Sequence, residues 1–67
     1  MDNIKIGRIC QKYRQEKGYR QKDVATDTGY TIENISAFER GITNNMKIFL
    51  WYLSIGLTYE ELKRWHD

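Results

Sequence analysis

The stretch RQKDVATDTGYTIENISAFERG, residues 20–41, decides the fold of this chain. Its apolar residues recur at helical spacing in two short segments, which we expect to form helices over about 21–28 and about 32–40. Gly29 separates the two segments and suits a backbone turn with positive φ. Thr31 follows in the position of a helix N-cap. The pattern therefore predicts two short helices joined by a tight turn.

Helical spacing continues on both sides of this stretch. A first helix is predicted to begin near Asn3 and to end before Gly18, and another to run over about 45–55. Thr58 and Glu61 form a capping-box pattern that opens a last helix. No hairpin turn and no sustained period-two alternation indicates a strand. We predict an all-α fold, a five-helix bundle, in one domain over 1–67. The expected core residues are Ile6, Ile9, Cys10, Tyr13, Val24, Ala25, Thr28, Ile35 and Phe38.

Length and composition limit the cellular setting. One cysteine, Cys10, cannot form an internal disulfide, which favours a reducing compartment. The longest apolar run, residues 48–57, is about half of the roughly 20 residues that span a bilayer. We expect a cytoplasmic protein of a bacterial cell that does not insert into membranes.

Charge is distributed unevenly along the chain. Residues 1–22 carry seven Lys or Arg and two acidic residues, whereas residues 23–67 carry four Lys or Arg and seven acidic residues. A basic N-terminal third suits contact with phosphates. It suits a solvated helix face equally well.

The sequence argues against an enzyme. His66 stands alone next to the last residue, Cys10 is an expected core residue, and neither paired carboxylates nor a metal-ligand cluster is present. No cofactor, metal or small-molecule substrate is therefore predicted.

A helix of about eight residues, a turn with Gly and a helix of about nine form a helix-turn-helix pattern. The residues that carry a family resemblance include the ending SIGLTYEEL, residues 54–62. The others are Ile6, Gly7, Cys10, Tyr13, Arg14, Lys17, Gly18, Gln21, Val24, Ala25, Gly29, Ile35, Ser36, Phe38, Glu39 and Gly41. With these residues the chain resembles the helix-turn-helix domain of lambdoid phage repressors and Cro proteins, a family of bacterial, phage and plasmid regulators. Residues 54–62 resemble that family's entry to its last helix.

The resemblance implies a lambda-repressor-like fold and a small phage or mobile-element regulator that binds operator DNA. It implies that Gln21 clamps a phosphate, although Gln21 also fits as an exposed polar residue. It implies a partly buried salt bridge between Arg14 and Glu39. The implied phosphate contacts are Arg20, Gln21, Arg40, Thr43, Asn44, Asn45 and Lys47. An ordinary polar loop would explain the later ones equally well.

The second of the two helices would place its N-terminal residues in the major groove. The implied base contacts are Thr31, Ile32, Glu33, Asn34 and Ala37. Asn34 suits a bidentate pair with adenine, Glu33 suits cytosine N4, and Ile32 suits a thymine methyl. Thr31 also fits as a cap only, and Glu33 as a favourable charge at the helix start.

Three features depart from the family pattern. Arg20 stands where the family has a cap residue, and the acidic residues Asp23, Asp27 and Glu33 oppose binding to phosphates. The helix over 45–55 has no polar face, so part of it should be exposed or covered by another chain. The expected oligomer interface consists of Trp51, Leu53, Leu57 and Trp65. Alternatively, Trp51 and Tyr52 simply cover a thin core.

Two functions follow from these features. The first is a sequence-specific DNA-binding transcriptional regulator, Cro-like or a short repressor, acting as a homodimer on double-stranded operator DNA. The alternative is a protein-binding modulator or anti-repressor. It would use Asp23, Asp27, Ile32 and Glu33 to dock on a partner repressor.

Overall fold

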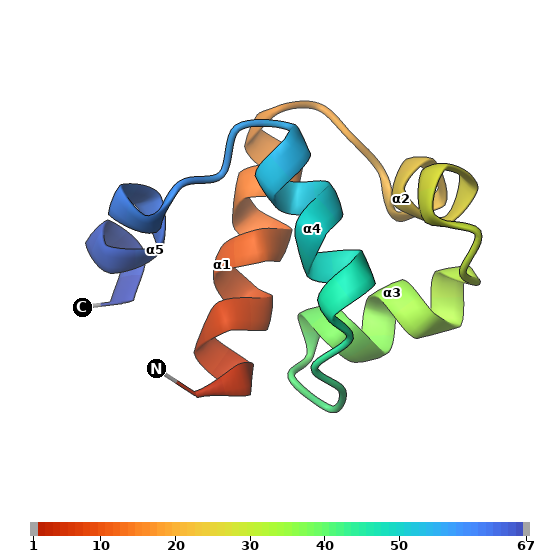
Figure 1. Cartoon of the computed structure of the whole chain (residues 1–67), viewed down its shortest axis with the longest axis horizontal. Coiled ribbons are helices and arrows are strands. Elements are labelled where there is room, and N and C mark those ends of the chain that lie inside the picture. The colour runs from red at the N-terminus through yellow and green to blue at the C-terminus, as the bar shows by residue number, and fades with distance from the viewer. Residues whose placement is uncertain (1, 67) are drawn as a thin grey trace.

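The computed structural model describes the backbone of residues 2–66 and the side chains of residues 2–64. All regular structure in this part of the chain is helical, which confirms the predicted all-α class. Figure 1 shows the helices in chain order. They are α1 (Asn3–Glu16), α2 (Gln21–Thr28), α3 (Ile32–Glu39), α4 (Met46–Ser54) and α5 (Tyr59–His66).

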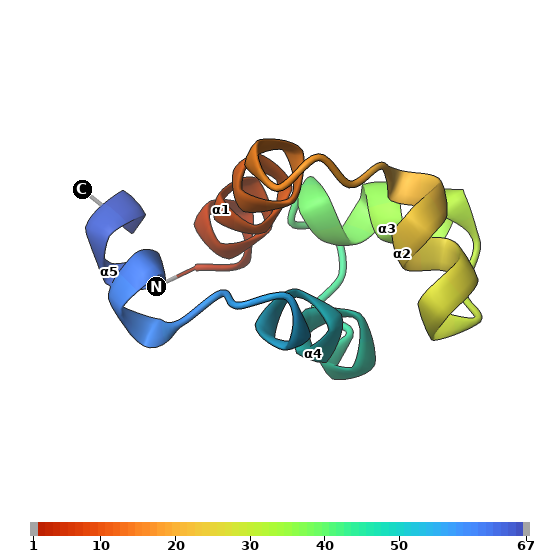
Figure 2. The same cartoon turned by 90° about the horizontal axis from the view of Figure 1, so that it is seen from above.

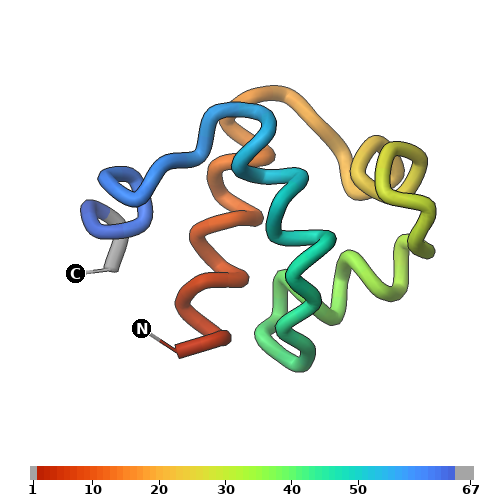
Figure 3. The backbone as a smooth tube through the Cα atoms, viewed as in Figure 1, coloured from red at the N-terminus to blue at the C-terminus, as the bar shows by residue number. Residues whose placement is uncertain are grey.

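The helices pack around α1 and α4. Helix α3 packs against α1 and α2, α4 packs against α1 and α2, and α5 packs against α1. Seen from above in Figure 2, α5 lies on the opposite side of α1 from the α2–α3 pair. In the tube of Figure 3, the start of α1 and the first part of α5 lie at the end of the molecule away from α2. The α2–α3 pair therefore forms one end of the molecule.

Local signals set the helix ends. The Asp2 carboxylate accepts a hydrogen bond from the backbone N–H of Lys5 at 2.9 Å and caps α1. Helix α2 ends at Gly29, whose φ of 81° lies in the left-handed region that favours glycine. Thr58 Oγ1 accepts from the backbone N–H of Glu61 at 3.3 Å at the start of α5. The expected boundaries are confirmed to within one residue for α2 and α3 and for the start of α1.

Close contact between α1 and α3 depends on Gly7. A Cβ atom built on Gly7 would lie 2.5 Å from the carbonyl oxygens of both Phe38 and Glu39. Only a residue without a side chain lets α1 approach the C-terminal end of α3 so closely.

The core joins residues from α1 to α4 and from the connection to α5. The Tyr52 ring stacks on Phe38 with centroids 5.6 Å apart and meets the Trp51 ring edge-on at 5.2 Å. Offset and edge-to-face pairs of this kind are the favoured arrangements of aromatic rings. The buried apolar residues are Ile9, Cys10, Tyr13, Val24, Ile35, Phe38, Ile48, Trp51, Tyr52 and Leu57.

Candidate nucleic-acid interface

A buried carboxylate fixes the C-terminal end of α3. Glu39 is 3% exposed and accepts hydrogen bonds from Arg14 Nε at 2.7 Å and Arg14 Nη2 at 3.1 Å. It also accepts from Gln21 Nε2 at 3.0 Å and from the Tyr52 hydroxyl at 2.5 Å. Arg14 further donates to the carbonyl of Tyr19 at 2.8 Å. The ion pair expected from the sequence is therefore present, and its carboxylate links side chains from α1, α2, α3 and α4.

Burial and the Glu39 carboxylate raise the pKa values of three neighbouring groups. Burial opposes the charge on Arg14, but hydrogen bonding to Glu39 and its negative charge outweigh this and raise the Arg14 pKa above its ordinary value. Burial, together with the hydrogen bond to Glu39, raises the pKa of Tyr52 well above its ordinary value. Burial also raises the pKa of the Cys10 thiol to about 12. All three groups therefore keep their protons at neutral pH.

Gln21 has a second role that the sequence did not indicate. Its side chain is half-buried, and its amide N–H donates to Glu39 rather than pointing freely into solvent. The side-chain oxygen makes no hydrogen bond within the described residues, and the backbone N–H lies in the first turn of α2, where helix N–H groups lack partners. Glu39 thus orients the residue to which the family resemblance assigns phosphate binding.

The N-terminal half of α3 is turned outward. Ile32 is 46% exposed, and Glu33 and Asn34 are also exposed. Ala37 is half-buried on the same helix face, one turn after Glu33. Ser36 is also half-buried and lies three residues after Glu33, although it is not among the base contacts that the resemblance implies. The i, i+3 spacing from Glu33 could have identified it.

Thr31 and Asn34 bind each other across the first turn of α3. Thr31 Oγ1 accepts from the backbone N–H of Asn34 at 3.1 Å. Asn34 Oδ1 accepts from the Thr31 backbone N–H at 3.1 Å and from the Thr31 hydroxyl at 2.9 Å. Both lone pairs of Oδ1 are therefore in use, and the bidentate adenine pair expected from the sequence lacks its acceptor in this conformation. The Asn34 amide N–H groups remain available to donate.

Two of the three acidic residues have roles inside the fold. Asp23 Oδ2 accepts from the backbone N–H of Arg20 at 2.7 Å, so Asp23 compensates for the poor cap residue at the start of α2. Asp27 Oδ2 accepts from the Trp51 indole N–H at 2.9 Å. Each of these two carboxylates therefore has a role in the fold besides the opposition to phosphate binding expected from the sequence. Glu33 is the acidic residue of this set with no hydrogen-bond or ion-pair partner among the described residues.

Candidate phosphate-binding side chains lie before α2 and between α3 and α4. Four of them are exposed without a hydrogen bond or ion pair inside the described part of the chain: Arg20, Thr43, Asn44 and Lys47. Arg40 is exposed as well, and its Nε donates to the carbonyl of Ser36 at 3.3 Å. Asn45 is the N-cap of α4, because its Oδ1 accepts from the Ile48 backbone N–H at 3.1 Å.

The expected oligomer interface needs correction. Trp51 is 7% exposed and Leu57 is 3% exposed, so both side chains belong to the core and cannot contact a second chain. Leu53 is 37% exposed and lies on an outward face of α4 with Leu50, which is 53% exposed. The side chain of Trp65 lies outside the described residues. The apolar character of α4 is therefore explained partly by a wide buried face.

Two further classes of site are absent from the described residues. No helix there is long and apolar enough to cross a membrane. Within the same residues, no three His, Cys, Asp or Glu side chains come together in a way that could hold a metal ion.

Of the comparisons with known proteins, the one with family models agrees with this geometry. No curated protein and no solved structure shows significant similarity to the chain. A family model described as helix-turn-helix matches residues 11–44, which include the second half of α1, all of α2 and α3 and most of the loop before α4. The matched segment is half of the chain. Members of this family are regulators that bind double-stranded DNA and are not enzymes. The chain belongs to the Cro/C1-type helix-turn-helix family of DNA-binding regulators.

Proposed function

We propose that this protein is a sequence-specific transcriptional regulator, Cro-like or a short repressor, that places α3 in the major groove of an operator. The observation that carries this proposal is the outward-facing N-terminal half of α3. Its exposed side chains have the chemistry of base readers, and the opposite side of the helix is fixed by Glu39. A rigid helix with a free reading face is what direct readout needs.

Base recognition would use short side chains and one acid. Glu33 accepts a hydrogen bond from cytosine N4, and Ile32 and Ala37 contact thymine methyl groups. Asn34 donates from its amide N–H groups to an acceptor such as purine N7, because its oxygen is held by Thr31. Ser36 joins this set, since a serine hydroxyl can donate or accept. Thr31 acts chiefly by fixing Asn34.

Phosphate contacts would flank the reading helix. Arg20 and Gln21 lie at the start of α2, where the free backbone N–H groups and the helix dipole favour an anion. Arg40, Thr43 and Asn44 follow α3, and Asn45 and Lys47 belong to the first turn of α4. Such contacts fix the position of the protein on the duplex, and the bases then supply specificity.

A homodimer would match two half-sites of an operator. Leu50 and Leu53 are the exposed apolar residues of α4 that remain once Trp51 is assigned to the core. We propose that they meet their equivalents in a second copy, because apolar surface of this kind favours a partner. Leu50→Lys would then lower the dimer fraction in sedimentation equilibrium, while circular dichroism stays unchanged. The setting we propose is the cytoplasm of a bacterial cell, with the gene carried by a phage or a mobile element.

The decisive experiment is a mobility-shift titration with DNA from upstream of the protein's own gene, at low and moderate salt. Glu33→Ala is compared with Glu60→Ala, because both glutamates are exposed second residues of their helices. We expect specific shifts that weaken steeply with salt, and a change of base preference for Glu33→Ala alone.

Failure to observe a specific shift at micromolar protein, with the helical fold intact by circular dichroism, would refute the operator-binding proposal. That outcome would favour the alternative, in which the exposed Ile32 and Glu33 dock on a partner repressor. An apolar contact of that kind weakens much less with salt than a phosphate contact.

A further inference from the structure

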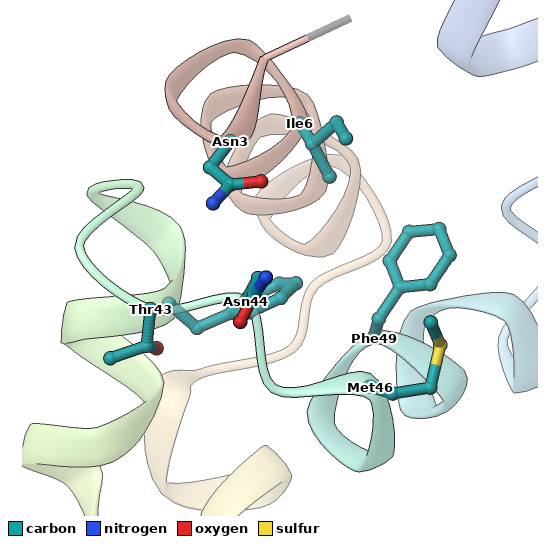
Figure 4. A pocket seen from close by; sticks show the side chains of 7 residues that line it. Asn3, Ile6, Thr43, Asn44, Met46 and Phe49 are labelled. Atoms are coloured by element: carbon teal, nitrogen blue, oxygen red, sulfur yellow. The ribbon is translucent and has the colours of Figure 1, made fainter.

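A hollow lies where the start of α1, the end of α3, the following loop and α4 meet. It has a volume of about 240 Å³. The lining residues are Asn3, Ile6, Phe38, Thr43, Asn44, Met46 and Phe49. In Figure 4, Asn3 and Ile6 extend from α1, Phe49 and Met46 from α4, and Asn44 from the loop between α3 and α4.

The lining has an apolar part and a polar part. Ile6, Phe38, Met46 and Phe49 supply carbon and sulfur, and the two phenylalanine rings are tilted by 42° with centroids 6.4 Å apart. The polar part consists of Asn3, Thr43 and Asn44, whose side chains make no hydrogen bond within the described part of the chain. None of the lining residues is charged. Apolar walls with a few unpaired polar groups are typical of sites for small neutral molecules.

Size and ring geometry narrow the class of ligand. A cavity of about 150 Å³ is enough to hold benzene in a protein core. The larger hollow here therefore accommodates one ring with a substituent, or two fused rings. Phenylalanine rings and a methionine thioether both make favourable contacts with aromatic rings. We propose that this hollow is a binding site for a small, neutral aromatic molecule that carries one hydrogen-bonding group.

Occupation of the site would affect DNA binding, a consequence that rests on the proposed function. Thr43 and Asn44 line the hollow and are also among the proposed phosphate contacts. Their side chains cannot bond a ligand and a phosphate with the same groups at once. The ligand and DNA would therefore oppose each other, and by linkage each would weaken the binding of the other by the same factor.

The first test uses indole as the probe, followed in proton–nitrogen NMR spectra of the free protein. We expect saturable shifts in the amide signals of the lining residues, with a Kd of about 1 mM or tighter for a molecule of this size. Indole-3-acetate should bind more weakly, because the lining offers no positive charge for its carboxylate.

A matched pair of variants locates the site. Met46 and Ile42 are each 65% exposed, but only Met46 lines the hollow. Met46→Ala should weaken indole binding about threefold or more through loss of one wall, and Ile42→Ala should leave it unchanged. Shifts that never saturate, or that respond equally to the two variants, would overturn the proposal.

The second test repeats the DNA titration with saturating indole. We expect DNA affinity to fall about fivefold or more. Unchanged DNA affinity with indole bound would overturn the proposed opposition between ligand and DNA. A protein that binds no DNA at all would refute the proposed function, and the NMR titration would still decide whether the hollow binds aromatic molecules.

Discussion

Replacement of Glu39 by glutamine tests the role of the buried carboxylate. Glu39→Gln keeps the shape of the side chain but removes its charge, and leaves the guanidinium of Arg14 without a counterion at 5% exposure. Removing one member of a buried ion pair costs about 3 to 5 kcal/mol. Domains typically gain about 0.05 to 0.15 kcal/mol per residue on folding. The loss is therefore a large part of the total stability of a 67-residue chain.

Urea unfolding followed by circular dichroism measures this loss. With an m-value of about 1 kcal/mol/M for a chain this small, the urea midpoint should fall by about 3 to 5 M, or the protein should be unfolded without urea. Glu16→Gln is the control, because Glu16 is exposed at the end of α1 and should change stability by less than about 0.5 kcal/mol. A loss below about 1 kcal/mol for Glu39→Gln would refute the conclusion that this carboxylate holds the helices together.

Three further predictions concern the packing of Gly7, the dependence of stability on pH, and the hydrogen bond between the Trp51 side chain and Asp27. Gly7→Ala should lower stability by about 1 to 3 kcal/mol in thermal unfolding, because the added Cβ atom would lie 2.5 Å from two carbonyl oxygens. A gain of about 1 kcal/mol, as expected at an exposed helix position, would contradict the close packing of α1 on α3. The pKa values of Cys10 and Tyr52 are raised in the folded state, so above the pKa of the unfolded chain each group holds its proton only while the protein is folded. The free energy of unfolding should therefore fall above about pH 9 for Cys10 and above about pH 10 for Tyr52, by up to about 1.4 kcal/mol per pH unit each. Urea midpoints against pH test this, and Cys10→Ala should remove the earlier decline; a flat profile would contradict it. Asp27→Ala should shift the Trp51 indole N–H resonance and cost about 1 kcal/mol, and an unmoved resonance would show that the bond is absent in solution.

Most of the fold follows from local signals in the sequence. Gly29 marks the turn by its backbone preference, Thr31 marks the start of α3 by its capping side chain, and both appear where expected. The Arg14–Glu39 pair followed from family resemblance, since nothing local connects two residues that are 25 positions apart.

The errors concern contacts between distant segments. The sequence places Trp51 at an interface because α4 is apolar on every side. In the structure α2 packs against α4 and Tyr19 packs against Trp51, so the Trp51 side chain is covered. Its ring meets Tyr19 edge-on at 5.3 Å, and its indole binds Asp27. Helical periodicity tells which residues share a face, but it does not tell how many neighbours cover that face.

The side chains that anchor α3 and those proposed to read DNA occupy different parts of the same short helix. Ile35, Phe38 and Glu39 are buried, whereas Ile32 and Glu33 are exposed. The outward positions can therefore be exchanged among related regulators without remaking the interior. A library randomised at Ile32 and Glu33 would retain folding in most members, and this makes the domain a suitable scaffold for grafting new operator preferences.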